Sequence, residues 1–562
     1  MAAFIKRNHI IFAIFLFLLI QSLNFAYRIG LEEFRDYEAY KSILNGKLPY
    51  LDFRWLYGPL GLFINALLLK MFGGELIVLR YMAIFAGCIA IILSYRICRF
   101  LMPKRAAAIA AFFAVFSFYN LPPHTYNHYY GMISNLAAIL MLFRFIKTRR
   151  SRSLFFAGVL LNISLLIHPL TFGAEMTASV VAWLLFFAFI ARTGIKRLLR
   201  FVLTFLAGTA VFTVPLYAFM ARTVPLTRVF ELLWSHVNYG PGYGIVFPVI
   251  RVFAPQETGG GLYALRHAIF NGFVDPLMFY LLLFAVPVTA AVSLLYSLRK
   301  QRDDASVLYL LFLTIVTVSI VLYFLHISYI GATLFLVARY YIQPPIILLS
   351  FLIHRLYTYS VRCGRSTLRS VIKVSSISFV AVFLFFYHGY RISDFFLKKW
   401  YTVDMTPIKG LRITDDDIKR YVEPSLYILS NSAEGDTLFV ADYDPAYYSL
   451  TGRESIFPED VYITMTPYFM EMSSRLYPRY EGGPMRMEDL IIKRIENEKP
   501  KFIVRCVTNR YRYDAPSQDL LTKYSLGPKV EEYLNNNYVL SKAFSFANND
   551  MEVRIYHLRG RE

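Results

Sequence analysis

The sequence has 562 residues, of which 57% are hydrophobic and 17% charged, with a formal net charge of +21. Long apolar runs along most of its length exclude an ordinary soluble protein. The 59 Lys and Arg residues stand in short clusters between these runs, so we interpret the charge as a signal of membrane orientation and expect no nucleic-acid partner. Only one of the four cysteines, Cys506, lies in a hydrophilic part, which therefore has no disulfide framework and no cysteine-based metal site.

About eleven apolar runs approach or reach the length needed to cross roughly 30 Å of hydrocarbon. They lie at residues 9–26, 76–100, 106–121, 131–146, 153–170, 172–191, 201–220, 273–298, 307–324, 339–357 and 371–389. The first run has no obvious small-residue cleavage site after it, so we expect an anchor rather than a removed signal peptide. The sequence predicts a polytopic α-helical membrane protein.

The apolar run at residues 59–72 is shorter than the others. A helix of this length, rising 1.5 Å per residue, spans only about 20 Å, so we expect it to lie in the membrane interface. With this run excluded from the spans, the strong basic clusters all fall on one side, which the positive-inside rule makes cytoplasmic. These clusters lie at residues 96–105, 147–152, 192–200, 299–302 and 362–373.

The N-terminus is then cytoplasmic, and the loops 27–75 and 221–271 and everything after residue 390 face outward, in a prokaryote the periplasm or cell exterior. After residue 391 the composition becomes that of a soluble domain of roughly 170 residues. Helix-like and strand-like patterns alternate there at residues 415–430, 437–441, 489–498, 502–507, 529–536, 538–546 and 552–557. We therefore predict a transmembrane domain at residues 1–391 and an outward α/β domain at residues 392–562.

The outward loop 27–75 gathers acidic residues in a chain that has few of them. They are Glu32, Glu33, Asp36, Glu38 and Asp52. Charge beside a membrane span must face water or a cavity, because hydrocarbon penalises it. On a helix, Asp36 shares a face with Glu32 and Tyr40, while exposure on a solvated helix surface is the favoured interpretation for Glu32, Glu33 and Glu38.

Asp52 follows Pro49 in a turn-forming sequence, so a structural role between two interfacial helices is favoured over catalysis. The next residues, Tyr57-Gly58-Pro59, place proline in the first turn of the short helix.

The pattern D-x-x-x-Y-x-x-x-L-x-G-K-x-P-Y-x-D from Asp36 to Asp52, followed by Y-G-P and a short apolar helix ending at Phe72, resembles the first outward loop of GT-C superfamily glycosyltransferases. Arg339-Tyr340 before two prolines, and residues 433–453, are similar to two further elements of this superfamily. It includes protein O-mannosyltransferases, lipid A aminoarabinose transferases and rhizobial galacturonosyltransferase-like proteins. The resemblance implies an inverting transfer of a hexose or pentose from a polyprenyl-phosphate carrier to a lipid, glycan or protein acceptor on the outer side of the membrane.

This reaction needs a carboxylate that takes the acceptor's proton and cations that hold the departing phosphate. The resemblance implies that Asp36 is the base. Arg339, with Tyr340, is a candidate for the phosphate contact. An equal alternative is that Arg339 only lies at the membrane interface with its charge in water. Arg80 is a weaker candidate for substrate binding, and Tyr40 and Asp52 complete the predicted contacts of the first loop.

Members of the superfamily often carry a second acid in the next outward loop, whereas residues 121–130 have none. His124 and His128 stand there at a spacing that suits a metal, but the prolines before them favour a loop, and we expect these rings to pack with aromatic groups at the level of the lipid headgroups. His128 is also a candidate for substrate binding. No metal or other cofactor is assigned. Glu175, an acid early in a span, is a further candidate for substrate contact.

Two features after the first spans remain open between a functional and a structural interpretation. The loop 221–271, with Trp234 and glycine-rich runs, either closes over a substrate or connects two spans. Asp442 and Asp444 follow a predicted strand, where they either bind a ligand or, as we favour, cap a helix.

Two other classes of protein remain alternatives. A transporter or flippase of lipid-linked sugars predicts paired inverted halves with broken helices, and the sequence has no such symmetry. A non-catalytic scaffold with an outward binding domain leaves the acids of the first loop unexplained.

Overall fold

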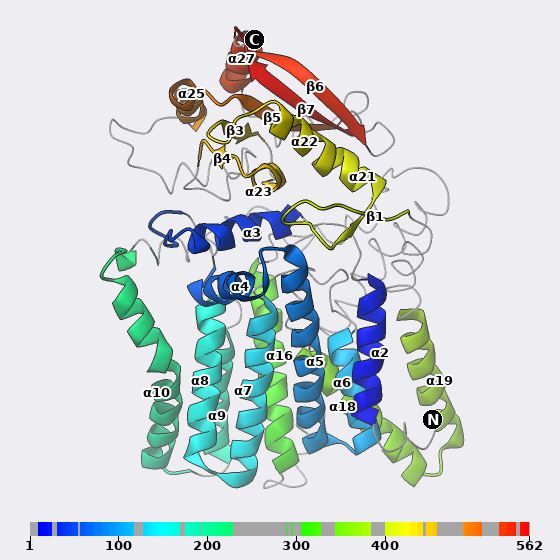
Figure 1. Cartoon of the computed structure of the whole chain (residues 1–562). Helices are drawn as coiled ribbons and strands as arrows, with labels where there is room; N and C mark the ends of the chain where they lie inside the picture. The colour runs from blue at the N-terminus through cyan, green and yellow to red at the C-terminus, as the bar shows by residue number, and fades with distance from the viewer. Residues whose placement is uncertain are drawn as a thin grey trace.

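The structure is a computed structural model of the whole chain. It describes residues 9–24, 31–53, 55, 57–116, 128–168, 175–190, 193–227, 229, 288, 291, 295, 305–327, 343–383, 399–441, 445–457, 487–508, 528–546 and 551–560. A bundle of helices forms one end of the molecule, and a sheet with its own helices forms the other (Figure 1).

The helices of the bundle run roughly alongside one another (Figure 1). Among the described residues, three of these helices are long and apolar enough to cross a membrane: α5, α7 and α10. The other bundle helices do not reach that length and hydropathy over the residues that could be assessed, and most of the predicted span 273–298 lies outside the described residues, so the number of spans stays a prediction. The helices of the bundle are α2 (His9–Asn24), α5 (Leu76–Leu101), α6 (Lys104–Phe116), α7 (His128–Thr148), α8 (Ser151–Ile167), α9 (Glu175–Ile190), α10 (Ile195–Met220), α16 (Ala305–Ile327), α18 (Gln343–Arg362) and α19 (Ser366–Phe383).

Close backbone contact holds α8 against α10. A Cβ atom added at Gly158 of α8 would come within 2.2 Å of the Phe205 carbonyl oxygen, and one added at Gly208 of α10 within 2.2 Å of the Phe155 carbonyl oxygen. Only glycine permits this approach, which small residues commonly provide between membrane helices. Large side chains such as Trp183 fill the rest of the bundle core.

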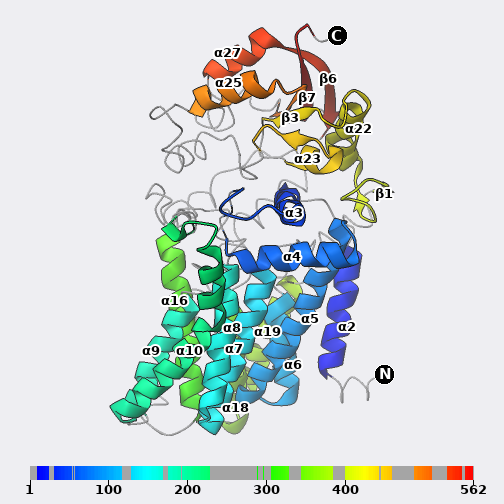
Figure 2. The ribbon, with the colours of Figure 1, turned by 60° about the vertical axis from the view of Figure 1, so that its left-hand side comes forward.

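Two helices cross the end of the bundle that faces the sheet: α3 (Leu31–Leu44) and α4 (Pro59–Phe72) (Figure 2). The α4 helix has the bounds predicted for the interfacial helix, with Gly58 as its N-cap and Pro59 in its first turn. Leu62 and Ala66 are buried, while Leu67 and Met71 are exposed. This helix therefore lies across the bundle and does not run along it, as its length predicts.

The basic connections lie at the opposite end of the bundle. Both the α7–α8 and the α18–α19 connections are there (Figure 1). The two ends thus differ in charge as the sequence predicts, and which end is cytoplasmic stays a prediction.

Among the described residues, the sheet has five strands in the order β4-β3-β5-β7-β6. Strands β4, β3 and β5 are parallel, and β7 pairs antiparallel with both β5 and β6. The strands are β3 (Thr437–Val440), β4 (Glu454–Ser455), β5 (Phe502–Thr508), β6 (Tyr538–Phe546) and β7 (Met551–Leu558). The α22 helix (Glu423–Ser430) precedes β3. The helices between the strands are α23 (Ala446–Thr451), α25 (Met487–Glu498) and α27 (Pro528–Asn537).

Side chains alternate across this sheet, because successive residues of a strand point to opposite faces. Leu438 and Val440 face a cluster that includes Ile428 of α22, whereas Phe439 faces a cluster that includes Ile491 of α25. Helices therefore cover both faces. The helices and strands predicted after residue 391 are present with bounds within a few residues of those predicted.

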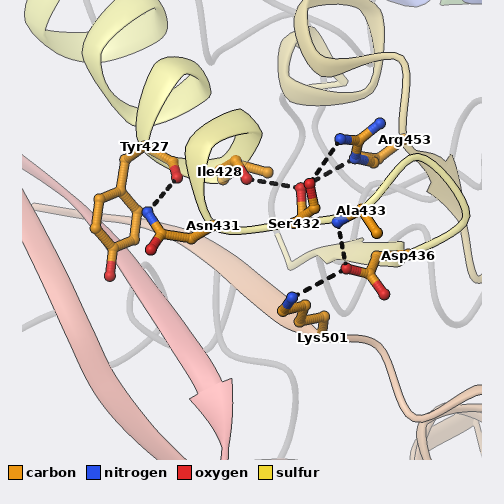
Figure 3. A network of polar contacts seen from close by, with 8 residues as sticks. All are labelled: Tyr427, Ile428, Asn431, Ser432, Ala433, Asp436, Arg453 and Lys501. Atoms are coloured by element: carbon orange, nitrogen blue, oxygen red, sulfur yellow. Dashed lines mark hydrogen bonds and ion pairs between the residues drawn. The ribbon is translucent and has the colours of Figure 1, made fainter. Parts of the chain in front are cut away.

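The connection from α22 to β3 is held by side chains (Figure 3). Arg453 donates to the hydroxyl and the carbonyl oxygen of Ser432, both at 3.0 Å. Asp436 accepts from the Ala433 amide at 2.7 Å and pairs with Lys501 at 3.1 Å. These contacts fix the direction in which the chain enters the first strand of the parallel set.

One hydrophobic cluster joins the bundle to the sheet. It includes residues of α3, α4 and the first turn of α5 together with residues of the segment before α22. In that segment, β1 (Tyr401–Thr402) pairs with β2 (Arg412–Ile413). The short helix α21 (Asp415–Asp417) follows, and the π-helix η5 (Ile418–Val422) leads into α22. Phe34 of α3 packs against Tyr421, with ring centroids 5.5 Å apart. The α3 helix is thus enclosed between the two halves of the molecule.

Candidate active site

Asp36 is the buried carboxylate at the centre of α3, with 2% of its surface exposed. Arg35 donates to its Oδ1 from Nε at 2.9 Å and from Nη2 at 2.8 Å. No described residue hydrogen bonds to Oδ2. Burial raises the pKa of Asp36, Arg35 opposes this shift, and Glu33 adds to it. Such a carboxyl group takes up a proton more readily than an exposed aspartate.

Glu33, on the same helix as Asp36, pairs with Arg80 of α5. The guanidinium donates to the two carboxylate oxygens at 3.0 and 2.7 Å, and both side chains are almost fully buried. The expectation that Glu33 lies on a solvated surface is therefore wrong, because α5 supplies a cation that the local sequence does not reveal. Arg80 neutralises this carboxylate, and its contact with a substrate stays a prediction.

Glu38 points away from the bundle, toward the sheet. Its carboxylate accepts from the Ser449 hydroxyl of α23 at 2.6 Å, and Lys41 lies 3.9 Å away. Burial raises the pKa of Glu38, and Lys41 and Ser449 oppose the shift. The expected solvated position is wrong here also, since α23 covers this part of α3.

Tyr40, one turn after Asp36 on α3, is hydrogen bonded to the bundle through α4. Asn65 of α4 donates to its hydroxyl at 2.8 Å, and Tyr130 of α7 donates to the Asn65 carbonyl oxygen at 2.6 Å. Asn65 is not among the residues predicted from the sequence. The available signal was an amide side chain in a helix that is otherwise apolar through Leu69.

Asp52 has the structural role that its sequence predicts. Its carboxylate accepts from the Leu48 amide at 2.7 Å, and its own amide donates to the Leu48 carbonyl at 2.9 Å, which closes the turn before α4. The side chain is exposed. Tyr50 in this turn has a φ of +69° and is buried. A substrate contact of Asp52 stays a prediction.

His128 begins α7 and packs in an aromatic group, as expected. Its ring centroid lies 5.0 Å from that of His168 and 5.9 Å from that of Tyr57, and Tyr57 lies 5.1 Å from His168. In the part of the chain that the structure describes, no three His, Cys, Asp or Glu side chains are arranged to hold a metal ion.

Several candidates lie outside the described residues. They are Arg339, Tyr340, His124, Trp234, Asp442 and Asp444. Glu175 is the first residue of α9, and the structure does not describe its side chain. The site seen here is therefore the part built on α3, α4, α5 and α7.

A helical bundle crossed at one end by two short helices and covered there by a separate sheet is an arrangement that this chain shares with solved structures that hold a polyprenyl phosphate. ArnT from Cupriavidus metallidurans bound to undecaprenyl phosphate matches with a TM-score of 0.57 at 12% identity, over 98% of each chain. The oligosaccharyltransferase AglB from Archaeoglobus fulgidus, in complex with an inhibitory peptide and a dolichol-phosphate, matches with a TM-score of 0.53 at 12% identity, over 96% of this chain and 80% of that one. The resemblance to the GT-C superfamily is confirmed at the level of the fold.

Residues 57–221 match the family model of dolichyl-phosphate-mannose-protein mannosyltransferases. The matched region begins at Tyr57, after α3, and includes α4 and the bundle helices through α10. No individually curated protein matches the sequence.

Proposed function

We propose that the protein is an inverting glycosyltransferase that moves a sugar from a polyprenyl-phosphate carrier to an acceptor at the end of the bundle covered by the sheet. The observation that carries this proposal is the buried carboxylate of Asp36, which lies where α3 is enclosed between bundle and sheet. The family match over residues 57–221 and the likeness to structures that hold a polyprenyl phosphate or a dolichol-phosphate support the donor class.

Asp36 acts as the general base. Its Oδ2 takes the proton of the acceptor hydroxyl while the acceptor oxygen forms a bond to the anomeric carbon. The bond from this carbon to the phosphate oxygen breaks on the opposite side, and the polyprenyl phosphate leaves with the electron pair. Arg35 holds Oδ1, so it fixes the orientation of the carboxylate during the proton transfer.

A polyprenyl phosphate is already a good leaving group, so the protein has only to hold its charge. Arg339 and Tyr340 are the proposed phosphate contacts from the late span, and Glu175 and His128 are proposed contacts in the bundle. The sugar, a hexose or pentose, and the lipid, glycan or protein acceptor are set by pocket shape. We place the enzyme in a prokaryotic plasma membrane, with residues 392–562 as its outward domain.

The test is sugar transfer by purified protein from polyprenyl-phosphate donors. Asp36→Asn is expected to lower kcat by about 10²- to 10⁴-fold, because the amide cannot accept the proton. Asp415→Asn is the matched control, since it neutralises an exposed carboxylate of α21, which pairs with Lys419 at 2.8 Å. Wild-type turnover by a folded Asp36→Asn protein would refute the assignment. Movement of the labelled lipid across vesicles without transfer would indicate a flippase instead.

A further inference from the structure

The turn between α18 and α19, with the residues on either side of it, forms a basic corner at the end of the bundle opposite the sheet (Figure 1). Hydrogen bonds fix the turn: the Arg365 amide donates to the Ser360 carbonyl oxygen at 3.0 Å, and Gly364 has a φ of +67°. The turn therefore holds the two helix ends beside one another. The cations of the basic corner are Arg355, Arg362, Arg365, Arg369 and Lys373.

The cations of the basic corner are not neutralised by nearby carboxylates. The sequence contains no Asp or Glu from residue 305 to residue 393. In the part of the chain that the structure describes, no carboxylate of another segment lies within ion-pair distance of these cations. All five residues are exposed, so their charge is available to an anion outside the protein.

The first turns of α19 expose a basic side and an apolar side together. Each residue advances a helix by about 100°, so residues two or five positions apart point to nearly opposite sides. Val371 and Val374 stand two and five positions after Arg369, and they are 54% and 61% exposed. The rest of the protein therefore covers neither side of this part of the helix.

The last turns of α18 show the same division. Tyr357, two positions after Arg355 and five before Arg362, is also exposed. Tyrosine is common where a membrane meets water, because its ring is apolar and its hydroxyl is polar. Apolar side chains are unfavourable in water and cations are unfavourable in hydrocarbon, so a surface that exposes both is suited to the level of the lipid headgroups.

The connection between α7 and α8, at the same end of the bundle, is different. Its cations Lys147, Arg150 and Arg152 are exposed, but the apolar residues before them, Phe145 and Ile146, are buried. Membrane orientation alone is sufficient to explain such a cluster. It does not explain why the basic corner places exposed apolar side chains opposite its cations.

We propose that the basic corner binds the phosphate groups of anionic phospholipids in the membrane leaflet at the end of the bundle away from the sheet. Its cations hold the lipid phosphates through charge-assisted hydrogen bonds. Tyr357, Val371 and Val374 lie at the level where the acyl chains begin. This site is at the opposite end of the bundle from α3 and Asp36, so it does not depend on the proposed function.

The test places a fluorescent reporter, Val371→Trp, in the full chain in lipid vesicles. Lipids with brominated acyl chains quench a tryptophan that they contact, and the signal of the four native tryptophans is subtracted. Brominated phosphatidylglycerol, which is anionic, is compared with brominated phosphatidylcholine, which has no net charge. We expect the anionic lipid to associate about 3- to 10-fold more strongly beside the reporter. Equal association of the two lipids, or quenching by neither, would overturn the proposal.

Two triple variants, each combined with the reporter, locate the effect. One replaces three cations of the basic corner: Arg362→Gln, Arg365→Gln and Arg369→Gln. The matched control removes the same charge from the α7–α8 connection: Lys147→Gln, Arg150→Gln and Arg152→Gln. The first variant is expected to bring the two lipids to nearly equal association, and the control is expected to keep the preference. Equal effects of the two triple variants would overturn the proposal.

Salt provides a second measurement, which serves where the first triple variant fails to fold. At about 1 M salt the screening length is only about 3 Å, so the preference for phosphatidylglycerol at the reporter is expected to fall below about 2-fold. A preference that salt leaves unchanged would show that charge does not carry it, and would also overturn the proposal.

Discussion

Glu33 of α3 and Arg80 of α5 form a two-contact ion pair with N–O distances of 3.0 and 2.7 Å, although 47 positions separate them in the sequence. The pair fastens the helix of the candidate base to the first turns of a bundle helix. Both side chains are almost completely buried, so each charge is stabilised in the protein interior by the opposite charge of its partner.

Removing the cation is expected to destabilise the protein. Arg80→Met leaves a buried carboxylate without its cation, which costs about 3–5 kcal/mol of unfolding free energy. The double variant Glu33→Gln with Arg80→Met removes both charges and is expected to recover part of this loss. Thermal unfolding in detergent measures both effects. Unchanged stability in Arg80→Met would show that the pair is not needed to hold α3 in place.

The pH dependence of transfer reports the ionisation of Asp36. Only the ionised carboxylate acts as a base, and burial raises its pKa. Activity is therefore expected to fall on acidification at a pH above that of an exposed aspartate. Arg35→Gln removes a neighbour that favours the ionised form, so the acid limb is expected to move up by about 1–3 pH units.

The measurement for this prediction is a profile of kcat/KM against pH for wild type and Arg35→Gln. Arg412→Gln, in the short strand β2, is the control for a change of net charge. A shift of the acid limb to lower pH in Arg35→Gln would contradict the role of Arg35.

The packing of α23 against Glu38 of α3 is expected to become less stable as pH rises, because burial disfavours the ionised carboxylate although the Ser449 hydroxyl donates to it. Burial raises the pKa of Glu38 in the folded protein above its ordinary value of 4.5. The folded state thus binds this proton more tightly than the unfolded chain, so its stabilising contribution is complete below about pH 4.5 and is lost as pH rises through the folded pKa. Hydrogen exchange of α23 amides should quicken over this range.

Two variants test that prediction. Glu38→Gln stays neutral at every pH, so the pH dependence of α23 exchange should disappear. Ser430→Ala is the control, since the side chain of this exposed serine bonds, among the described residues, only to α22 and to its C-cap Asn431. A pH dependence that persists in Glu38→Gln would place its source in another group.

Gly58 is expected to tolerate no side chain. A Cβ atom there would lie 2.0 Å from the Leu166 carbonyl oxygen, and the Gly58 amide donates to Ile167 at 2.9 Å. Gly58→Ala must push α4 away from α8, at a cost of about 1–3 kcal/mol. Gly194→Ala is the matched control, because Gly194 is also a helix N-cap with similar backbone angles, and its Cβ would meet no atom within 4 Å. Equal unfolding temperatures for the two variants would refute this prediction.

The elements of this fold follow closely from local patterns. Runs of apolar residues predicted the helices of the bundle, the length of residues 59–72 predicted a helix that does not cross, and alternating patterns predicted the strands of the sheet. Asp52 closes a turn as Pro49 and its neighbours indicate. These features depend on residues near one another in the chain, so sequence is sufficient to find them.

The partners of the buried charges could not be read from sequence. Glu33, Asp36 and Glu38 lie within six positions on one helix, and local reasoning placed two of them on a solvated surface. The partner of Asp36 is its neighbour Arg35, whereas Glu33 and Glu38 depend on Arg80 of α5 and Ser449 of α23, which lie far from them in the sequence.

The sequence by itself determined a membrane bundle, an α/β unit and an acidic first loop with Asp36 as the candidate base. The tertiary structure decided that Glu33 is paired with Arg80, that Glu38 meets the sheet unit, and that Asn65 connects Tyr40 to Tyr130. The reason is physical: apolar periodicity is a property of neighbouring residues, whereas the pairing of a buried charge or amide depends on which distant element is packed against it.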